Sequence, residues 1–253
     1  MPKKKENLSP EERLIKAVTP KEEEPYKLPD NWVWTRLGNV IEYTENLDIQ
    51  KKMLSDDLIN YVDIESIDNI NYKIKAVKVK KVSELSSRAR RVLKKGYILY
   101  SSVRPYLNNI ALIEHEKENY IGSTGFFVFK SIMGENKYIF NFLLSSYVKS
   151  YYLNSLKGFN SPSISNNIFE NTLFPLPPFD EQKRIVEKLD SLFEKTGKIK
   201  EIIEEVKEKT SLRREAVLSK AFTGELTEKW RAENKTENAK ELLLKIGYVT
   251  TNS

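Results

Sequence analysis

The most regular hydrophobic pattern of the chain lies between residues 180 and 222, where it predicts one long helix. Apolar or threonine side chains recur there at alternating steps of four and three residues, which is typical of a coiled-coil seam. At about 1.5 Å per residue the helix would be roughly 65 Å long. The predicted seam consists of Ile185, Leu189, Leu192, Thr196, Ile199, Ile203, Val206 and Thr210.

A seam of this length needs a partner helix, because a compact domain cannot cover it from end to end. One alternative is that it packs on residues 212–246 of the same chain, which include Leu226 and Trp230. The alternating spacing is sustained for about three and a half heptads, which favours pairing with a second chain.

The pattern before this helix predicts a mixed α/β domain over residues 31–179, and therefore an α+β fold class. Helical periodicity appears over residues 138–156, and residues 158–167 (GFNSPSISNN) are polar and predict a loop. Short runs of branched and aromatic residues predict strands. These runs lie at 32–34, 73–82, 97–100, 110–113 and 126–129.

The two ends of the chain predict smaller elements. Residues 1–30 indicate a short helix and a linker: Ser9-Pro10-Glu11-Glu12 has the form of a capping box, and prolines follow it. Residues 180–253 contain the long helix followed by a short C-terminal helix. The chain is therefore divided into regions 1–30, 31–179 and 180–253.

Composition restricts the classes of protein to consider. The 253 residues include no cysteine, which excludes disulfides and thiolate metal sites. No apolar run is long enough to span a membrane, and the N-terminus lacks the apolar stretch of a signal peptide. A cytoplasmic protein that does not bind membranes is the simplest interpretation.

Positive charge is concentrated in one segment. Between Lys73 and Arg104 there are eleven Lys and Arg residues and a single acidic residue, Glu84, whereas the whole chain has a net charge of +6. Such a field attracts polyanions, nucleic acid above all. The alternative is a solvated strand face, because several of the lysines alternate with Ile74, Val77 and Val79.

Catalytic chemistry is difficult to assign. The only histidine, His115, lies in a charged stretch that predicts an exposed loop, and no phosphate-binding glycine motif is present. Residues 176–179 (LPPF) approach a methyltransferase motif, but leucine cannot accept the hydrogen bonds that its first position needs. Glu181 and Lys183 match half of a nuclease motif but open a helix, where acidic residues are favourable. We therefore expect no catalytic residue, no cofactor and no metal.

Four segments, in order, resemble the specificity subunits of type I restriction–modification systems. Residues 28–38 (LPDNWVWTRLG) are similar to the start of their target-recognition domain, and residues 94–105 (KKGYILYSSVRP) to a GDIL…S.VRP stretch. Residues 175–186 (PLPPFDEQKRIV) resemble the segment that leads into their coiled-coil helix, and 221–227 (AFTGELT) the end of that helix. Tyr97 departs from the aspartate that is common in the family.

The resemblance implies a function without catalysis. Such subunits carry two target-recognition domains joined by two antiparallel helices, and each domain reads half of a bipartite site in double-stranded DNA. Methyltransferase (M) subunits and restriction (R) subunits supply the chemistry. This chain has one such domain and one helix, so the resemblance implies a homodimer with an antiparallel coiled coil and a palindromic bipartite target. A truncated chain that pairs with a full-length subunit is the alternative.

Two groups of side chains are candidates for contacting DNA. Arg104 can bind guanine in bidentate fashion, and amide or hydroxyl side chains can match base edges. An ion pair for Arg104 and an ordinary capped loop for residues 160–167 are the structural alternatives. The predicted base-reading residues are Arg104, Tyr106, Asn108, Asn160, Ser161, Ser163, Asn166 and Asn167, and the predicted phosphate contacts are Arg88, Arg90, Arg91, Lys94, Lys95 and Lys157.

Two other classes of function remain open from the sequence. One is an interaction scaffold in which the coiled coil matters and the basic surface is incidental; binding to DNA that does not respond to salt would favour it. The other is a metal-dependent nuclease that uses Glu181 and Lys183, which would require magnesium-dependent nicking lost on Glu181→Ala.

Overall fold

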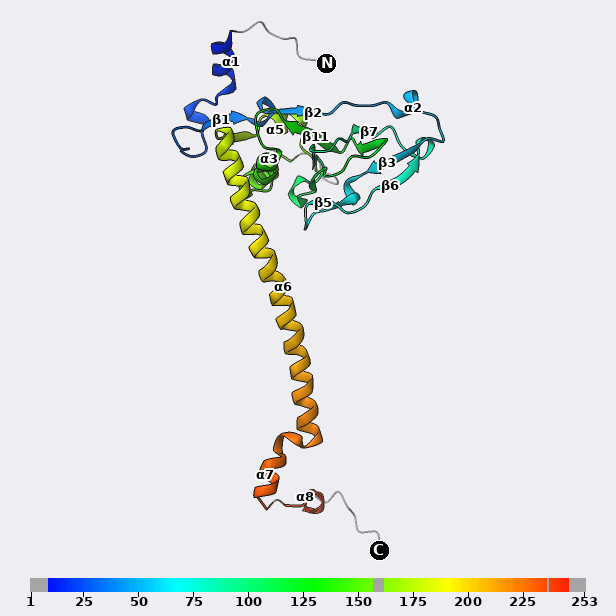
Figure 1. The fold of residues 1–253 in the computed structure, drawn as a ribbon, viewed down its shortest axis with the longest axis vertical. Helices are drawn as coiled ribbons and strands as arrows, with labels where there is room; N and C mark the ends of the chain where they lie inside the picture. Colours follow the sequence, from blue (N-terminus) through cyan, green and yellow to red (C-terminus); the bar gives the residue numbers. More distant parts are fainter. Residues whose placement is uncertain (1–8, 157–161, 236, 246–253) are drawn as a thin grey trace. The chain divides into compact units, whose positions relative to one another are not determined.

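The fold was described from a computed structural model, in which residues 9–156, 162–235 and 237–245 are described (Figure 1). The chain forms two compact units, residues 1–189 and residues 190–253. The first unit contains all of the strands found in the described residues, and the second is helical.

Strands are short and dispersed along the first unit. Their bounds are β1 Val33–Arg36, β2 Ile41–Tyr43, β3 Leu58–Val62, β4 Ile67–Asp68, β5 Lys73–Ile74, β6 Lys78–Lys81, β7 Ala89–Val92, β8 Ile98–Ser101, β9 Ile110–Leu112, β10 Tyr120–Ser123, β11 Phe126–Ser131 and β12 Leu173–Leu176.

Helices lie mainly at the two ends of the chain and between β11 and β12. Their bounds are α1 Pro10–Ala17, α2 Ile49–Lys52, α3 Asn136–Leu143, α4 Ser146–Ser155, α5 Asn166–Glu170, α6 Phe179–Thr223, α7 Glu228–Glu233 and α8 Ala239–Lys245. The predicted capping box at Ser9 is confirmed, because the Ser9 hydroxyl accepts from the Glu12 amide and the Glu12 carboxylate accepts from the Ser9 amide.

Two four-stranded sheets build the first unit, in the orders β6-β3-β10-β7 and β2-β11-β8-β9. In the second of these sheets, side chains on both faces are buried. Alternate residues of a strand point to opposite faces, so Phe127 and Phe129 of β11 join one apolar cluster, while Phe126 and Val128 join another. This explains why β8 and β11 read as unbroken apolar runs in the sequence. The mixed α/β architecture with a long C-terminal helix is confirmed.

Three local predictions need correction. The predicted strand over residues 73–82 is divided into β5 and β6, because β5 pairs with β4 in a two-stranded sheet whereas β6 pairs with β3 in a four-stranded one. The helical pattern at 138–156 forms two helices, since Ser145 caps a new helix through the Val148 amide. The polar segment at 158–167 is not loop to its end, because Ser165 caps α5 and Asn166 is its first residue.

Gln182 fixes the start of α6 to the first unit. Its side chain is 2% exposed, accepts from the Glu135 amide and donates to the carbonyls of Met133 and Pro177. A Cβ on Gly134, whose φ is +152°, would lie 1.9 Å from the Gln182 Oε1 atom, so this close contact requires glycine. Gln182, which stands between the Glu181 and Lys183 of the half nuclease motif, therefore holds the start of the helix in place.

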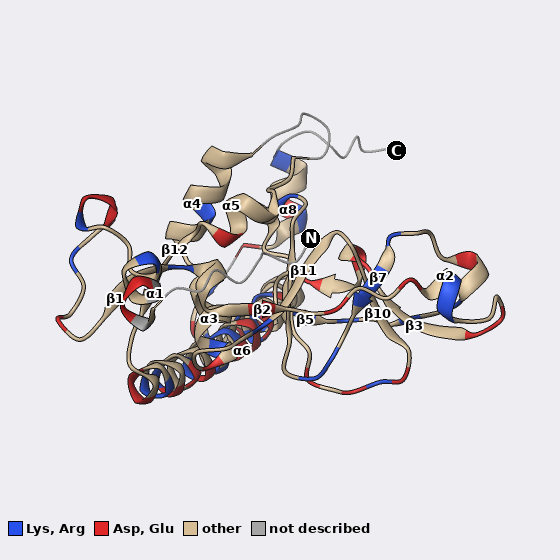
Figure 2. Ribbon diagram, turned by 90° about the horizontal axis from the view of Figure 1, so that it is seen from above, with Lys and Arg blue, Asp and Glu red and all other residues tan. Residues whose placement is uncertain are grey.

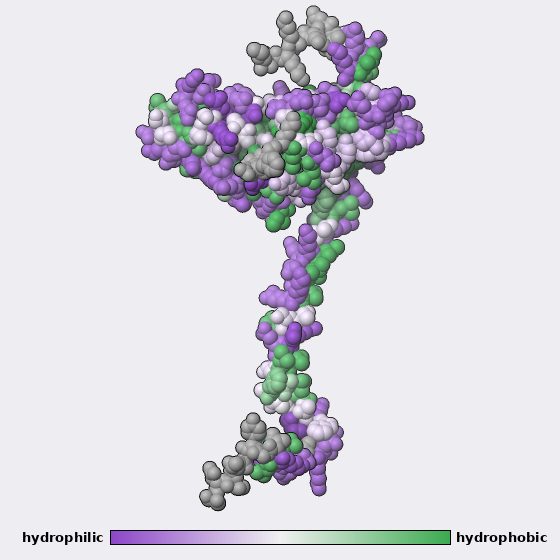
Figure 3. All heavy atoms as spheres, turned by 180° about the vertical axis from the view of Figure 1, so that it is seen from behind, coloured by the Kyte–Doolittle hydropathy of each residue, from purple (hydrophilic) through white to green (hydrophobic). Residues whose placement is uncertain are grey.

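Beyond Leu189 the predicted seam is exposed to solvent. Leu192 and Ile203 are each 46% exposed, and Ile199 and Val206 are each 56% exposed. Figure 3 shows hydrophobic side chains on the surface of this helix among hydrophilic ones. Thr196 and Thr210 donate their hydroxyls to the carbonyls of Leu192 and Val206, so neither seam threonine needs an outside partner. The long helix is confirmed, and its pairing stays a prediction.

Candidate nucleic-acid interface

The end of β8 brings together two polar segments that are about 60 residues apart in the sequence. The Arg104 amide donates to the Pro162 carbonyl at 2.8 Å, and the Ile164 amide donates to the Ser102 carbonyl at 3.0 Å. Val103 and Ser163 form an isolated β-bridge between these bonds. We call residues 102–109 and 162–167 the polar edge. Of the predicted base-reading residues, the first segment contains Arg104, Tyr106 and Asn108, and the second contains Ser163, Asn166 and Asn167.

The backbone of the polar edge is strained on both sides of a short turn. Arg104 and Asn108 have φ values of 47° and 53°, and the 3-10 turn Pro105–Leu107 lies between them. Such left-handed conformations are costly for side chains other than glycine, and a residue before proline is restricted further. Strain of this kind is found where a site must hold one geometry. It therefore supports a binding role for this turn.

A third segment supports the turn, and the sequence did not indicate it. The Asn69 side chain, in the β4–β5 turn, donates to the Leu107 carbonyl at 3.0 Å. Asp68 holds that turn by accepting from the Asn71 side chain and from the amides of Asn71 and Ile70. These hydrogen bonds, with the Asn71 side chain first, lower the pKa of Asp68 to about 2. An aspartate followed by asparagine one and three residues on is typical of such turns and is the signal that could have found it.

Helix α5 supplies the far side of the polar edge. Phe169 is completely buried and stacks on Phe127, with ring centroids 4.3 Å apart, so this one side chain anchors a helix of five residues. Asn166 is exposed at its start. Asn167 is also exposed, but its backbone carbonyl and side-chain oxygen accept from the Asn171 amide group. Asn166 is thus the more accessible of the two predicted asparagines.

Exposure separates the remaining predicted base readers. Arg104 is exposed, whereas Tyr106, Asn108 and Ser163 are partly buried. Three of the predicted contacts lie outside the described residues: Lys157, Asn160 and Ser161.

Five of the predicted phosphate contacts lie in or next to β7: Arg88 precedes it, Arg90 and Arg91 lie within it, and Lys94 and Lys95 follow it. Arg88 is exposed, and its carbonyl accepts from the Thr124 amide. The next residue along the chain, Gly125, accepts through its carbonyl from the Ser102 amide of the polar edge, so Arg88 lies near that edge. Lys94 and Lys95 follow the other end of the strand, roughly 20 Å away at the usual rise of an extended chain. Of these five residues, Arg88 is therefore the one that the described structure brings to the polar edge.

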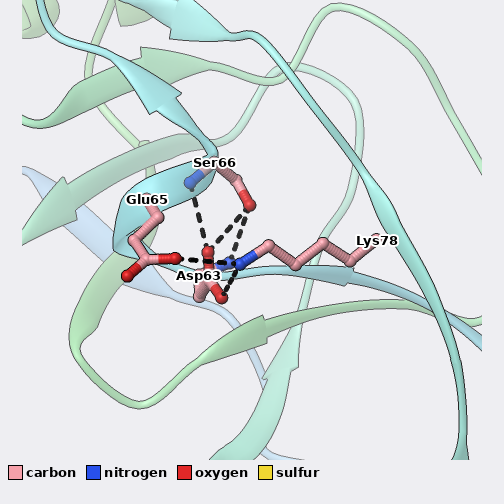
Figure 4. Close-up of polar contacts among 4 residues, drawn as sticks. All are labelled: Asp63, Glu65, Ser66 and Lys78. Atoms are coloured by element: carbon pink, nitrogen blue, oxygen red, sulfur yellow. Dashed lines mark hydrogen bonds and ion pairs between the residues drawn. The ribbon is translucent and has the colours of Figure 1, made fainter.

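Aspartate and glutamate side chains between positions 45 and 65 form ion pairs with part of the basic segment and neutralise its charge. Figure 4 shows Lys78 held by Asp63 and Glu65. Burial alone would raise the pKa of Asp63, but hydrogen bonds from Lys78 and Ser66 outweigh it and lower this pKa. Figure 2 shows basic and acidic segments together around α2, β3 and β7. The other pairs are Lys81–Asp56 at 2.8 Å, Arg90–Asp48 at 3.7 Å and Lys94–Glu45 at 2.9 Å.

Arg91 differs from its neighbours because it is partly buried. Its Nη1 donates to the Asn46 side chain at 3.1 Å, and its Nε atom is buried with no hydrogen-bond partner among the described residues. Burial lowers the pKa of its guanidinium. Arg91 therefore offers a phosphate less of its surface than Arg88 does.

The residues considered for catalysis have structural contacts. Glu181 accepts from the Asn31 side chain at 3.1 Å, and the Lys183 ammonium lies 4.2 Å from the centre of the Phe179 ring. Within the described ranges, no three His, Cys, Asp or Glu side chains are grouped so that they could hold a metal ion. Over the same ranges no helix has the length and apolar character to cross a membrane.

A comparison with protein families places this chain among DNA specificity proteins. A model of the type I restriction modification DNA specificity domain matches residues 29–208. The specificity subunit of the Escherichia coli type I restriction enzyme EcoDI is 26% identical over 209 residues, which are 82% of this chain and 45% of that protein. The MjaVIII specificity subunit of Methanocaldococcus jannaschii is 31% identical over 203 residues, 75% of this chain and 46% of that protein.

Solved structures are similar over the same region. The HsdS subunit from Thermoanaerobacter tengcongensis has a TM-score of 0.67 and 36% identity, and the match covers 74% of this chain and 48% of that one. A chain from a structure concerned with complex assembly of the type I R-M system has a TM-score of 0.68 and 35% identity, covering 78% and 51%. This chain thus spans about half the length of the relatives it matches.

Proposed function

Because the chain belongs to the type I restriction modification DNA specificity family, we propose that it is a DNA-recognition subunit. It binds double-stranded DNA at the polar edge, chooses the target sequence and has no catalytic residues of its own. Methyltransferase and restriction subunits of the type I system are its partners and supply the chemistry. Two copies form a homodimer through α6 and read the two halves of a palindromic bipartite site.

The observation that carries this proposal is the construction of the polar edge. Two segments rich in hydroxyl and amide groups are fixed to each other by backbone hydrogen bonds, and the first of them carries an exposed arginine, Arg104. Side chains of this kind can match the donors and acceptors that base pairs present in the major groove. A rigid sheet buried on both faces supports the edge, so its side chains are positioned before DNA arrives.

The homodimer has its own support. The chain spans 45–46% of the length of two relatives and carries one sheet-containing unit and one long helix among its described residues. Its long helix also carries a row of exposed apolar side chains, which water disfavours. A second copy would supply a second recognition domain and a helix to cover this row.

The proposal is tested by mass measurement followed by DNA selection. Light scattering on the purified chain should give a dimer, and selection from a random DNA library with an M subunit present should return a split palindrome. A dimer that selects no sequence, with or without an M subunit, would leave an interaction scaffold as the better description. Magnesium-dependent nicking by the chain alone would contradict the absence of catalysis.

Arg104→Lys is expected to relax sequence preference at one base pair in each half-site. Lysine keeps the positive charge but loses the planar pair of donors, and a bidentate contact contributes about 1–3 kcal/mol of discrimination. The measurement is a binding titration against single-base variants of the selected site. The matched control is Arg88→Lys, which should leave the ranking of sites unchanged because a phosphate contact needs charge rather than a fork. If Arg104→Lys ranked the single-base variants in the same order and by the same factors as the parent, the assignment would be contradicted.

A further inference from the structure

The seam of α6 has a symmetry that selects one way of pairing with a second copy. Its steps of 4, 3, 4, 3, 4, 3 and 4 residues read the same in both directions. Taking the antiparallel homodimer that the family resemblance implies, on which this inference rests, we propose that the two α6 helices are in register about an axis midway between Gly197 and Lys198. In this pairing, residues 210–217 of each copy lie in a groove at the start of the other copy's α6.

Every seam position then meets another seam position. Ile185 faces Thr210, Leu189 faces Val206, Leu192 faces Ile203 and Thr196 faces Ile199 of the second copy. Each threonine faces an isoleucine, and both threonine hydroxyls are already satisfied by their own helix. No polar group is therefore left without a partner when this seam is buried.

Sliding the helices by one heptad loses this match. A slide in one direction places Val206 opposite Gln182, which is 2% exposed and already bonded within the first unit. A slide in the other direction places Leu189 opposite Arg213. Burying a charged side chain against leucine is costly. Each slide also leaves only six of the eight seam residues opposite another seam residue, whereas the central register pairs all eight, so both neighbouring registers are worse.

The groove at the start of α6 extends the match beyond the seam. Its apolar part consists of Pro178, Ile185 and Leu189, and the carboxylates of Asp180 and Glu181 lie on its rim. Arg184, Lys188 and Asn31 line the rest of it. It is open to solvent and lies wholly within residues 31–189, so a second copy can reach it.

The central register brings a complementary segment to this groove. Arg213 and Arg214 of the second copy come to the turn that carries Asp180 and Glu181, and Val217 comes to Pro178. Val217 is 54% exposed in the single chain, so it gains apolar contact on pairing. Two arginines next to two carboxylates also favour this orientation over a parallel one, in which like charges would meet.

Disulfide cross-linking tests the register directly, because the chain has no cysteine of its own. The variant Leu189→Cys/Val206→Cys should give a covalent dimer on mild oxidation. Its two cysteines are about 25 Å apart along one helix, so a bond within one chain is impossible. The control pairs Leu189→Cys/Ile199→Cys and Leu192→Cys/Thr210→Cys correspond to the two slid registers and should stay uncoupled.

Charge reversal tests the groove. The variants Asp180→Lys/Glu181→Lys and Arg213→Glu/Arg214→Glu should each dimerise about tenfold more weakly than the parent, because like charges then meet. An equimolar mixture should form a heterodimer with nearly the parent's affinity. Recovery in the mixture would also prove that both variants fold.

The outcomes separate this inference from the function it rests on. A dimer that cross-links through a control pair, or through Leu189→Cys alone, would overturn the register and leave the homodimer standing. A mixture that recovers no heterodimer would overturn the role of the groove. A parent chain that is monomeric by light scattering would overturn the homodimer and the register together.

Discussion

The variant Ile203→Glu should be monomeric and should bind the complete bipartite DNA site 10² to 10⁴ times more weakly than the parent. Each chain would place a carboxylate in the middle of the apolar seam, where an unpaired charge cannot be buried. Without the dimer, the second half-site is no longer held at high effective concentration, which accounts for an affinity loss of the order 10²–10⁴. Light scattering and a DNA-binding titration on the complete site measure the two effects.

The matched control for this variant is Lys198→Glu, which adds a carboxylate to the same helix away from the seam. It breaks an exposed ion pair with Glu194, a contact of 2.7 Å that contributes little to stability. Binding to an isolated half-site should be the same for the parent and both variants. If Ile203→Glu stayed dimeric with full affinity, the seam would not be the dimer contact.

Replacing Phe169 with alanine should lower the free energy of unfolding of the first unit by about 3–5 kcal/mol. Phe169 is fully buried, and its ring lies within 5.6 Å, centre to centre, of the rings of Phe127, Phe129 and Tyr100. Removing it empties the centre of this aromatic cluster and releases α5 with Asn166. Chemical denaturation gives the stability, and DNA binding at a temperature where the variant is folded gives the effect on the polar edge.

Leu54→Ala is the control for this loss, because Leu54 is 75% exposed. Removing an exposed leucine should change the free energy of unfolding by no more than about 0.5 kcal/mol. A Phe169→Ala variant as stable as Leu54→Ala would mean that neighbouring side chains move to fill the space left by the ring. DNA binding at parental strength by folded Phe169→Ala would show that α5 does not position the polar edge.

Periodicity predicted the long helix and the strands with unbroken apolar runs, because burial on both faces and a seven-residue repeat leave a direct mark in the sequence. It did not predict where elements break, since those breaks depend on local hydrogen bonds, such as that from the Val148 amide to the Ser145 hydroxyl, and on which strand each segment pairs with. Strands with few apolar residues, such as β7 (ARRV), were also missed, because charged side chains occupy their partly buried positions.

The candidate site was only partly predictable, for a different reason. Arg104 and Ser163 were both chosen for their side chains, but nothing in the sequence indicated that their backbones lie side by side. The neutralisation of Lys78 by Asp63 was equally hidden, because the two residues come from adjacent strands of one sheet rather than from one segment. Charge counted along the chain therefore overstates the field that DNA would meet.

The way the polar edge is attached affects how such a protein can evolve. Its side chains stand on turns, while the packing that holds those turns uses other residues, Phe169 and Pro105 among them. An exchange at Arg104 or Asn166 therefore alters the surface without disturbing the core. Single substitutions can therefore change the preferred target one step at a time, and the protein stays folded after each substitution.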